Sequence, residues 1–299
     1  MSIPPKIGAL LTLLLVGFLV GNVLLLWPWP TTAQVEFFTG TPEFLVWLSL
    51  VSVLFAVLPL CAFYGLSVAM RLQRTVGPFS RRSLFALFIL LLLFLLPFGT
   101  LAHFPDIFPL VDLPSFELRV NLVTLFCGIC AEPIAISLIW LGLAIHQLRP
   151  EIDTFPEIYF LAKRDLSGLV GAIGLIIGLG TLTTGALQNA LAVLYEEFGL
   201  ANNQVFPPIL AVVYGAYFSL ILVVIYWPLE KALLDRASKY LDIHIPLPPL
   251  AAANWSERHS LRQQAATWLG LETALLTPRS ALVIFTPLLS GLLAYLLPG

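Results

Sequence analysis

The chain has 299 residues, of which 59% are hydrophobic and only 11% are charged, with a mean hydropathy of +0.94 and a net charge of −2. Soluble domains carry about 25% charged residues, so this composition excludes an ordinary soluble protein and indicates one integral to a membrane. The basic residues are too sparse for a nucleic-acid surface, and we expect the lipid bilayer as the partner that surrounds the chain.

Seven segments are apolar over about the 20 residues that a membrane-spanning helix needs. They cover residues 7–27, 44–70, 83–102, 120–146, 167–194, 209–228 and 280–297. The remaining loops are too short to contain a soluble catalytic domain. The sequence therefore predicts a single membrane domain over residues 1–299, an all-α polytopic helix bundle of about seven transmembrane helices.

The lysines and arginines fix the expected orientation of these spans. All but one of the 15 fall in the N-terminal tail or in the connections on one side, and only Arg119 falls on the other. Positive residues concentrate in cytoplasmic loops, so we expect the N-terminus in the cytoplasm and the C-terminus outside. The compact, loop-poor topology favours a bacterial inner membrane.

The predicted span 120–146 carries an ionisable residue, Glu132, almost at its midpoint. A charge at that depth costs at least roughly 2.5–3.5 kcal/mol, so such residues usually face a protein interior or a wet cavity. Pro133 follows directly and removes a backbone donor, which leaves carbonyls of the preceding turn open to an ion or water. Glu132 and Pro133 thus suggest a cation or proton site. The alternative is a protonated Glu132 that donates a hydrogen bond to a neighbouring helix and only fixes packing.

The same span contains the pattern Cys127-Gly-Ile-Cys130, which in other settings signals thiol exchange or metal binding. No second such pair and no nearby histidine completes a zinc site, and Glu132 points to the opposite side of the helix from both thiols. We interpret the two cysteines as small buried apolar residues and expect no metal and no cofactor.

Span 167–194 combines glycines with polar side chains. Small residues recur at steps of three or four, a spacing typical of close helix packing: Gly168, Gly171, Gly174, Gly178, Thr181 and Gly185. We expect Gly171, Gly174, Gly178 and Gly185 to be the packing positions. The middle and outer part of the span carries a polar set: Thr181, Thr184, Gln188 and Asn189. Thr181 and Glu132 can share a depth in the membrane, so we expect this set to line a polar site that faces Glu132.

Two connections on the cytoplasmic side carry most of the charge. Residues 147–165 are expected to be a solvated connector. Residues 229–279 are expected to contain amphipathic helices, the first continuing the sixth span beyond Pro228 and the second beginning near Ser256. The second helix can lie in the membrane interface or dock against a partner, and the pattern does not separate these two interpretations.

These features lead to three hypotheses about function. The first is a channel or transporter for a small cation, proton or small solute, with Glu132 as its central group. The second is a non-catalytic membrane subunit that docks partner proteins, as a homo-oligomer or in a membrane complex. The third is a membrane thiol oxidoreductase that uses Cys127 and Cys130. The sequence shows no nucleophile or metal motif at membrane depth, so we do not expect an enzyme.

Overall fold

The structure is a computed structural model, and it describes residues 7–26, 31–76, 113, 115–199, 209–249, 254–271 and 278–296 together with residues 85 and 89. Within these residues every regular element is a helix. The helices are α1 (Ile7–Leu26), α2 (Ala33–Gly40), α3 (Pro42–Val76), α5 (Phe116–Gln147), α6 (Phe155–Glu197), α7 (Ile209–His244), α8 (Trp255–Leu269) and α9 (Pro278–Leu296).

Five of the described helices are long and apolar enough to cross a membrane, namely α1, α3, α5, α6 and α7. Within α9, the apolar helix Ser280–Leu296 is shorter. The prediction of an all-α polytopic membrane bundle is therefore confirmed. The predicted span 83–102 lies outside the described residues except for Phe85 and Ile89, so the number seven stays a prediction.

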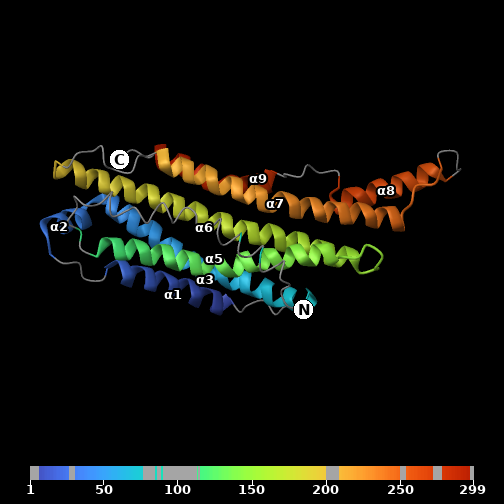
Figure 1. The fold of residues 1–299 in the computed structure, drawn as a ribbon, viewed down its shortest axis with the longest axis horizontal. Helices are drawn as coiled ribbons and strands as arrows, with labels where there is room; N and C mark the ends of the chain where they lie inside the picture. The colour runs from blue at the N-terminus through green and yellow to red at the C-terminus, as the bar shows by residue number, and fades with distance from the viewer. Residues whose placement is uncertain are drawn as a thin grey trace.

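The long helices run side by side along the long axis of the molecule (Figure 1). Helix α3 packs against α1, α5 and α6, whereas α9 packs against α6 and α7. The short helix α2 lies at one end of this bundle, and α8 lies beyond the opposite end, beside the last turns of α7. Because α8 runs back along α7, its axis follows the bundle and does not lie across it.

Helices α6 and α7 extend well beyond the thickness of a membrane. With 43 residues, α6 is about 64 Å long, whereas the hydrocarbon core of a bilayer measures about 30 Å. Residues 155–165, which the sequence suggested were a solvated connector, are the first turns of α6. Helix α7 continues past Pro228 to His244, as predicted.

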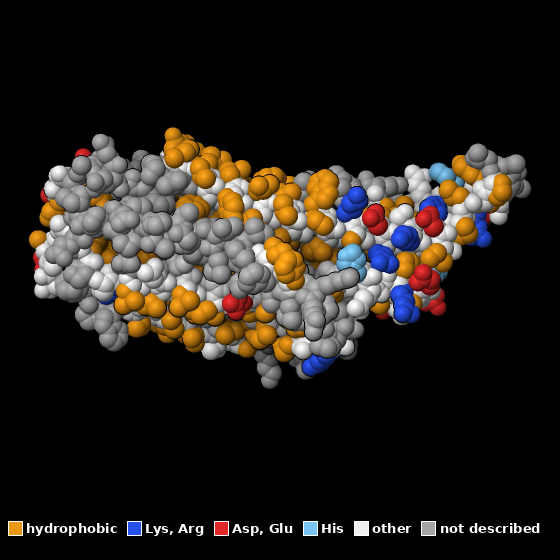
Figure 2. All heavy atoms as spheres, viewed as in Figure 1, with side chains coloured by type: hydrophobic (Ala, Val, Ile, Leu, Met, Phe, Trp, Pro, Cys, Tyr) orange, Lys and Arg blue, Asp and Glu red, His pale blue; other side chains and the backbone are white. Residues whose placement is uncertain are grey.

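We call residues 155–166 of α6, residues 229–244 of α7 and the whole of α8 the polar extension. Figure 2 shows that hydrophobic side chains are spread along the bundle, whereas most of the visible Lys, Arg, Asp and Glu side chains gather at the end where α8 lies. This distribution of charge agrees with the sequence pattern that placed the basic connections on one side of the membrane.

Glycines bring α6 and α9 into close contact. A Cβ atom built on Gly185 would lie 2.3 Å from Cβ of Ala294, and one on Gly178 would lie 2.7 Å from Cγ2 of Thr286. A Cβ atom built on Gly174 would lie 2.8 Å from the carbonyl oxygen of Val283. Gly171, at the beginning of the same stripe, has nothing within 4 Å of such a Cβ. Three of the four predicted packing glycines therefore lie against α9.

Candidate functional site

Glu132 lies near the middle of α5, and its side chain is exposed on the surface of the bundle. In the part of the chain that the structure describes, no hydrogen bond or ion pair joins it to another residue. The next residues toward the inside, Ile134 and Ser137, are both fully buried. Among the described helices, the carboxyl group therefore points away from the interior of the bundle, near the middle of a helix that is long and apolar enough to cross a membrane.

Glu132 ends a continuous exposed surface on one side of α5. This surface, which we call the Glu132 face, consists of Leu118, Asn121, Leu122, Leu125, Gly128, Ile129 and Glu132. Its members recur every three or four residues, so they lie on one side of the helix. Beyond Glu132 the same side becomes half-buried, at Ile136 and Leu143. The Glu132 face thus covers the first half of α5 and contains two polar side chains.

Pro133 shapes the helix next to Glu132. Because proline has no N–H, it cannot donate the helical hydrogen bond that the carbonyl of Ile129 would normally accept. On the inner side, the Ser137 hydroxyl donates to the carbonyls of Pro133 at 2.7 Å and Gly65 at 2.6 Å. This turn of α5 is therefore fixed to α3, while Ile129 and Glu132 face outward.

The polar side chains of α6 lie elsewhere. Thr181 and Gln188 are buried, whereas Thr184 and Asn189 are half-buried. The hydroxyl of Thr181 donates to the carbonyl of Ile177 at 2.8 Å, and that of Thr184 donates to Gly180 at 2.9 Å. Both hydroxyls thus bond within their own helix. The described part of the chain does not bring these side chains and the outward-facing Glu132 into one pocket.

The cysteines are inside the bundle. Cys61 and Cys130 are buried and Cys127 is half-buried, and all three are free thiols. Among the described residues, no group of three or more His, Cys, Asp or Glu side chains could hold a metal ion. The thiol hypothesis has no accessible pair to rely on, because a reactive thiol needs exposure.

Two buried carboxylates, which the sequence did not single out, hold the base of the polar extension together. The side chain of Asp165 on α6 is 2% exposed and forms an ion pair with Arg71 of α3. Nε of Arg164 lies 3.8 Å from the same carboxylate. A buried charge is costly unless it is paired, so this contact fixes α3 to α6.

The second carboxylate, Glu230, joins α6 to α7. Nζ of Lys163 lies 3.8 Å from its Oε1 atom, and the Glu230 side chain is 7% exposed. Tyr226 donates a hydrogen bond to Glu230 and is also hydrogen-bonded to Ser280 at the start of α9. The signal in the sequence was the i, i+4 spacing of Tyr226 and Glu230, but the partners Lys163 and Ser280 come from distant helices.

Further hydrogen bonds attach α8 to α6 and to the end of α7. Tyr159 of α6 is buried, and its hydroxyl donates to the carbonyl of Leu269 at 2.8 Å. Arg262 of α8 lies against the end of α7, where it donates to Oδ1 of Asp242 at 2.5 Å and to the carbonyl of Ile245 at 3.0 Å. The polar extension is therefore a fixed helical unit in which α8 packs on α6 and α7.

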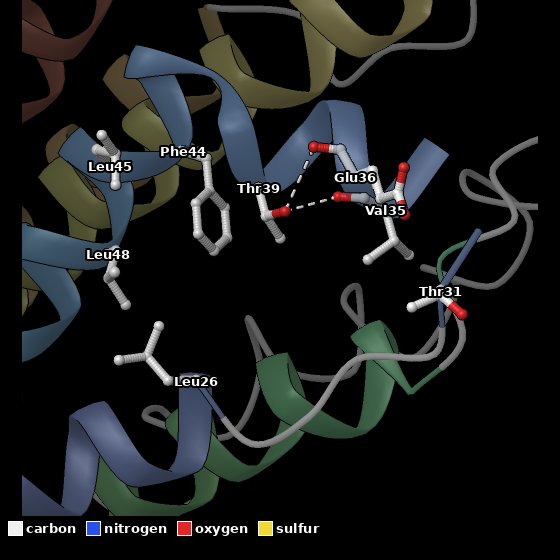
Figure 3. Close-up of a pocket in the computed structure, with 8 residues that line it drawn as sticks. All are labelled: Leu26, Thr31, Val35, Glu36, Thr39, Phe44, Leu45 and Leu48. Atoms are coloured by element: carbon white, nitrogen blue, oxygen red, sulfur yellow. Dashed lines mark hydrogen bonds between the residues drawn. The ribbon is translucent and has the colours of Figure 1, made fainter. Parts of the chain in front are cut away.

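The surface has a hollow of about 370 Å³ between the end of α1, helix α2 and the start of α3 (Figure 3). Its lining is mainly apolar, with Glu36 as the single carboxylate: Leu26, Thr31, Val35, Glu36, Thr39, Phe44, Leu45 and Leu48. The Thr39 hydroxyl donates to the carbonyls of Val35 and Glu36 in its own helix. The hollow has no converging set of polar groups and none of the predicted site residues.

Comparisons with protein-family models, with curated proteins and with solved structures find no match to this chain. What the protein does therefore has to be inferred from its own residues. The feature with the most direct physical consequence is the exposed carboxyl group of Glu132.

Proposed function

We propose that this protein is a non-catalytic subunit of a membrane assembly, in which the Glu132 face packs against another membrane helix. The observation that carries the proposal is the exposure of Glu132 in the middle of a 32-residue apolar helix. A bacterial inner membrane is the membrane that the short loops favour. Docking of a soluble component on residues 229–279 belongs to the same proposal.

The energetic reason is the poor fit between a carboxyl group and lipid. Insertion of an acidic side chain at the centre of a bilayer costs roughly 2.5–3.5 kcal/mol, and hydrocarbon offers no hydrogen-bond partner that could offset this cost. A second helix over the Glu132 face can provide such a partner. Asn121 would also gain a hydrogen-bond partner from such a helix, because its amide is exposed on the same face.

The remaining residues of the Glu132 face suit helix packing. Leu125 and Ile129 are 59% and 56% exposed, so they have contact area to offer a partner. Between them, Gly128 has nothing within 4 Å of a Cβ built on it, and a glycine at this position lets two helix backbones approach closely. Apolar area, a small residue and two polar groups are together what interfaces between membrane helices use.

Photo-crosslinking in intact membranes tests this proposal. A photoreactive amino acid at position 125 should form an adduct with protein. The same amino acid at position 220 of α7, where Leu220 is 62% exposed, is the matched control and should react with lipid alone. Lipid adducts alone at both positions would contradict the proposal.

A second candidate function is the passage of a proton or a small cation at Glu132 within that interface. The arrangement around Pro133 favours it, because the carbonyl of Ile129 lacks its helical donor and Ile129 lies on the same exposed face as the Glu132 carboxyl. Oxygen atoms of these two kinds are ligands for hard cations and acceptors for protons.

Flux measurements in proteoliposomes test this second function. Glu132→Gln should abolish proton or cation flux, because an amide cannot ionise. Glu36→Gln changes an exposed carboxylate on α2, outside the predicted spans, and should leave the flux unchanged. Equal flux from the wild-type protein and Glu132→Gln, with the same oligomeric state, would exclude transport through this residue.

A further inference from the structure

We infer that α3 and α6, where they reach the polar extension, bind the phosphate group of an anionic membrane lipid. The site consists of the guanidinium groups of Arg71 and Arg164 and the hydroxyl group of Tyr64, and the buried carboxylate of Asp165 joins the two helices. We call these four residues the phosphate cluster. It is separate from the Glu132 face and goes beyond the proposed function. Its charge, its hydrogen-bond donors and its depth support the inference.

The charges of the phosphate cluster do not balance. Among the described residues, the other ion pairs each join one carboxylate to one cation. Asp165 instead has a cation at each oxygen, because Arg71 donates to Oδ2 and Nε of Arg164 lies 3.8 Å from Oδ1. Two positive charges meet one negative charge, which leaves one positive charge in excess. The cluster therefore suits a further anion with a single charge.

Arg164 has hydrogen-bond donors to offer such an anion. Its side chain is 67% exposed, and the contact with Asp165 is its only ion pair or hydrogen bond among the described residues. A guanidinium group carries five N–H groups, and their planar fork matches two phosphate oxygens at once. Arg71 is 32% exposed and lies at the other oxygen of the same carboxylate. An anion bound to Arg164 would therefore lie close to a second guanidinium group.

A glycine brings one more donor to the cluster. A Cβ atom built on Gly168 would overlap Oη of Tyr64, so the glycine lets this hydroxyl lie against α6, one turn from Asp165. The hydroxyl is close enough to Asp165, Arg164 and Arg71 to interact with their charges. In the part of the chain that the structure describes, it forms no hydrogen bond. A phenol hydroxyl can donate to a phosphate oxygen.

The phosphate cluster lies at the depth of lipid headgroups. The predicted span 44–70 ends directly before Arg71, and the predicted span 167–194 begins two residues after Asp165. Two residues of a helix rise about 3 Å, whereas the headgroup layer on each side of a bilayer is about 5–8 Å thick. The bilayer therefore holds phosphate groups beside the cluster, and we assign a lipid as the source of the anion.

Charge selects the class of lipid. Phosphatidylglycerol has one net negative charge, whereas the phosphate of phosphatidylcholine is compensated by the ammonium group of the same headgroup. The excess positive charge of the cluster favours the first of these two lipids. A basic residue near an anionic headgroup changes the affinity by about fivefold.

Competition between two lipids with the same acyl chains tests the site. The full chain in mild detergent is mixed with equal amounts of phosphatidylglycerol and phosphatidylcholine, and native mass spectrometry measures which lipid is bound. The wild-type protein should prefer phosphatidylglycerol by about fivefold. Arg164→Gln should remove this preference and keep the fold, because Asp165 retains its bond to Arg71. Arg258→Gln removes an exposed arginine of α8 instead, and as the matched control it should keep the preference.

Free phosphate is the other source of the same chemistry, and thermal unfolding separates the two. A short-chain phosphatidylglycerol should raise the unfolding temperature of the wild-type protein and of Arg258→Gln, but not that of Arg164→Gln. Inorganic phosphate at the same concentration should have no such effect. Equal stabilisation by inorganic phosphate would overturn the assignment to a lipid.

Two further results would overturn the inference. One is a wild-type protein that binds the two lipids equally. The other is an equal loss of preference in Arg164→Gln and Arg258→Gln, because this would show that the total positive charge of the chain attracts the lipid without a defined site. Neither result would bear on the Glu132 face.

Discussion

Arg71, near the end of α3, donates a hydrogen bond to the carboxylate of Asp165 on α6, and this contact joins residues that are 94 positions apart in the chain. The Asp165 side chain is 2% exposed, whereas that of Arg71 is 32% exposed. The pair lies where the apolar part of the bundle meets the polar extension. It therefore connects the membrane part of the fold to the helices that project beyond it.

We expect Asp165→Asn to lower the free energy of unfolding by about 1–3 kcal/mol, because the substitution removes the charge that pairs with Arg71. A double-mutant cycle with Arg71→Gln, followed by denaturant unfolding in micelles, measures the coupling. The pair formed by Arg262 and Asp242 is the control, since the Asp242 side chain is 61% exposed and its coupling should stay below about 1 kcal/mol. Equal coupling in the two cycles would refute a special role for Asp165.

Two substitutions in the glycine stripe of α6 should have different effects on the stability of the protein. Gly185→Ala should destabilise the protein by about 1–3 kcal/mol, because the new methyl group would meet Ala294 of α9 at 2.3 Å. Gly171→Ala has open space and removes a glycine from a helix, so it should be neutral or stabilising by up to about 1 kcal/mol. Thermal unfolding of the two variants checks this difference. Similar shifts for both would contradict the described contact between α6 and α9.

Tyr159→Phe should loosen α8 without unfolding the bundle. The substitution removes only the hydroxyl, which donates to the carbonyl of Leu269 at 2.8 Å and accepts a longer bond from Nζ of Lys163 in its own helix at 3.5 Å. Loss of the bond to Leu269 typically costs about 1 kcal/mol. Amide hydrogen exchange should therefore rise in the last turn of α8 and stay unchanged in α3. Tyr217→Phe, on the membrane part of α7, is the control substitution. Unchanged exchange in α8 would show that this bond does not hold the helix.

Arg119 should hold the C-terminal end of α1. It is 5% exposed, and its Nη1 atom donates to the carbonyls of Leu24 at 3.0 Å and Leu25 at 2.7 Å. These carbonyls belong to the last turn of α1. Carbonyl groups in the last turn of a helix have no N–H donor within the helix, so a side chain can supply one. Arg119→Gln should increase hydrogen exchange at the end of α1, whereas the exposed Arg74→Gln should not. An equal response to both changes would exclude this capping role.

Apolar stretches alone predicted the centres of the helices but not their ends. For α6 the prediction covered 167–194, while the helix runs from Phe155 to Glu197. The apolar run of the sequence stops at the charged residues Lys163 and Asp165. The helix nevertheless continues through them, because Lys163 pairs with Glu230 and Asp165 pairs with Arg71. Since those partners come from α7 and α3, no local pattern reveals the extension.

The eight-residue helix α2 was missed for another reason, since it lies in the connection between the predicted spans 7–27 and 44–70. It is too short to stand out in a window of about 20 residues. Its local signal is Thr32, whose side chain accepts a hydrogen bond from the backbone N–H of Val35 at 3.2 Å. A capping threonine before Glu36 is a typical start of a helix, because the cap satisfies a free N–H group.

The position of Glu132 along its helix was predictable, whereas its direction around the helix was not. Position along an apolar segment gives the depth directly. The direction of a side chain around the helix axis can be predicted only where one side of the helix is more polar than the other. Helix α5 is apolar on nearly all sides. The expected polar site between Glu132 and Thr181 therefore stays a prediction, and in this chain alone Glu132 faces outward while Thr181 is buried.

The most direct test asks what touches the Glu132 face in the assembled protein. A spin label would be attached to Ile129→Cys, one turn from Glu132 on the same face, in a variant whose native cysteines are replaced by alanine. The assembly, purified in mild detergent, would be transferred to nanodiscs. Collision with oxygen dissolved in the lipid should be several-fold rarer there than for the same label at Val224→Cys, an exposed position of α7. Equal collision rates at the two positions would show that the Glu132 face is in contact with lipid, and would contradict an enclosed interface.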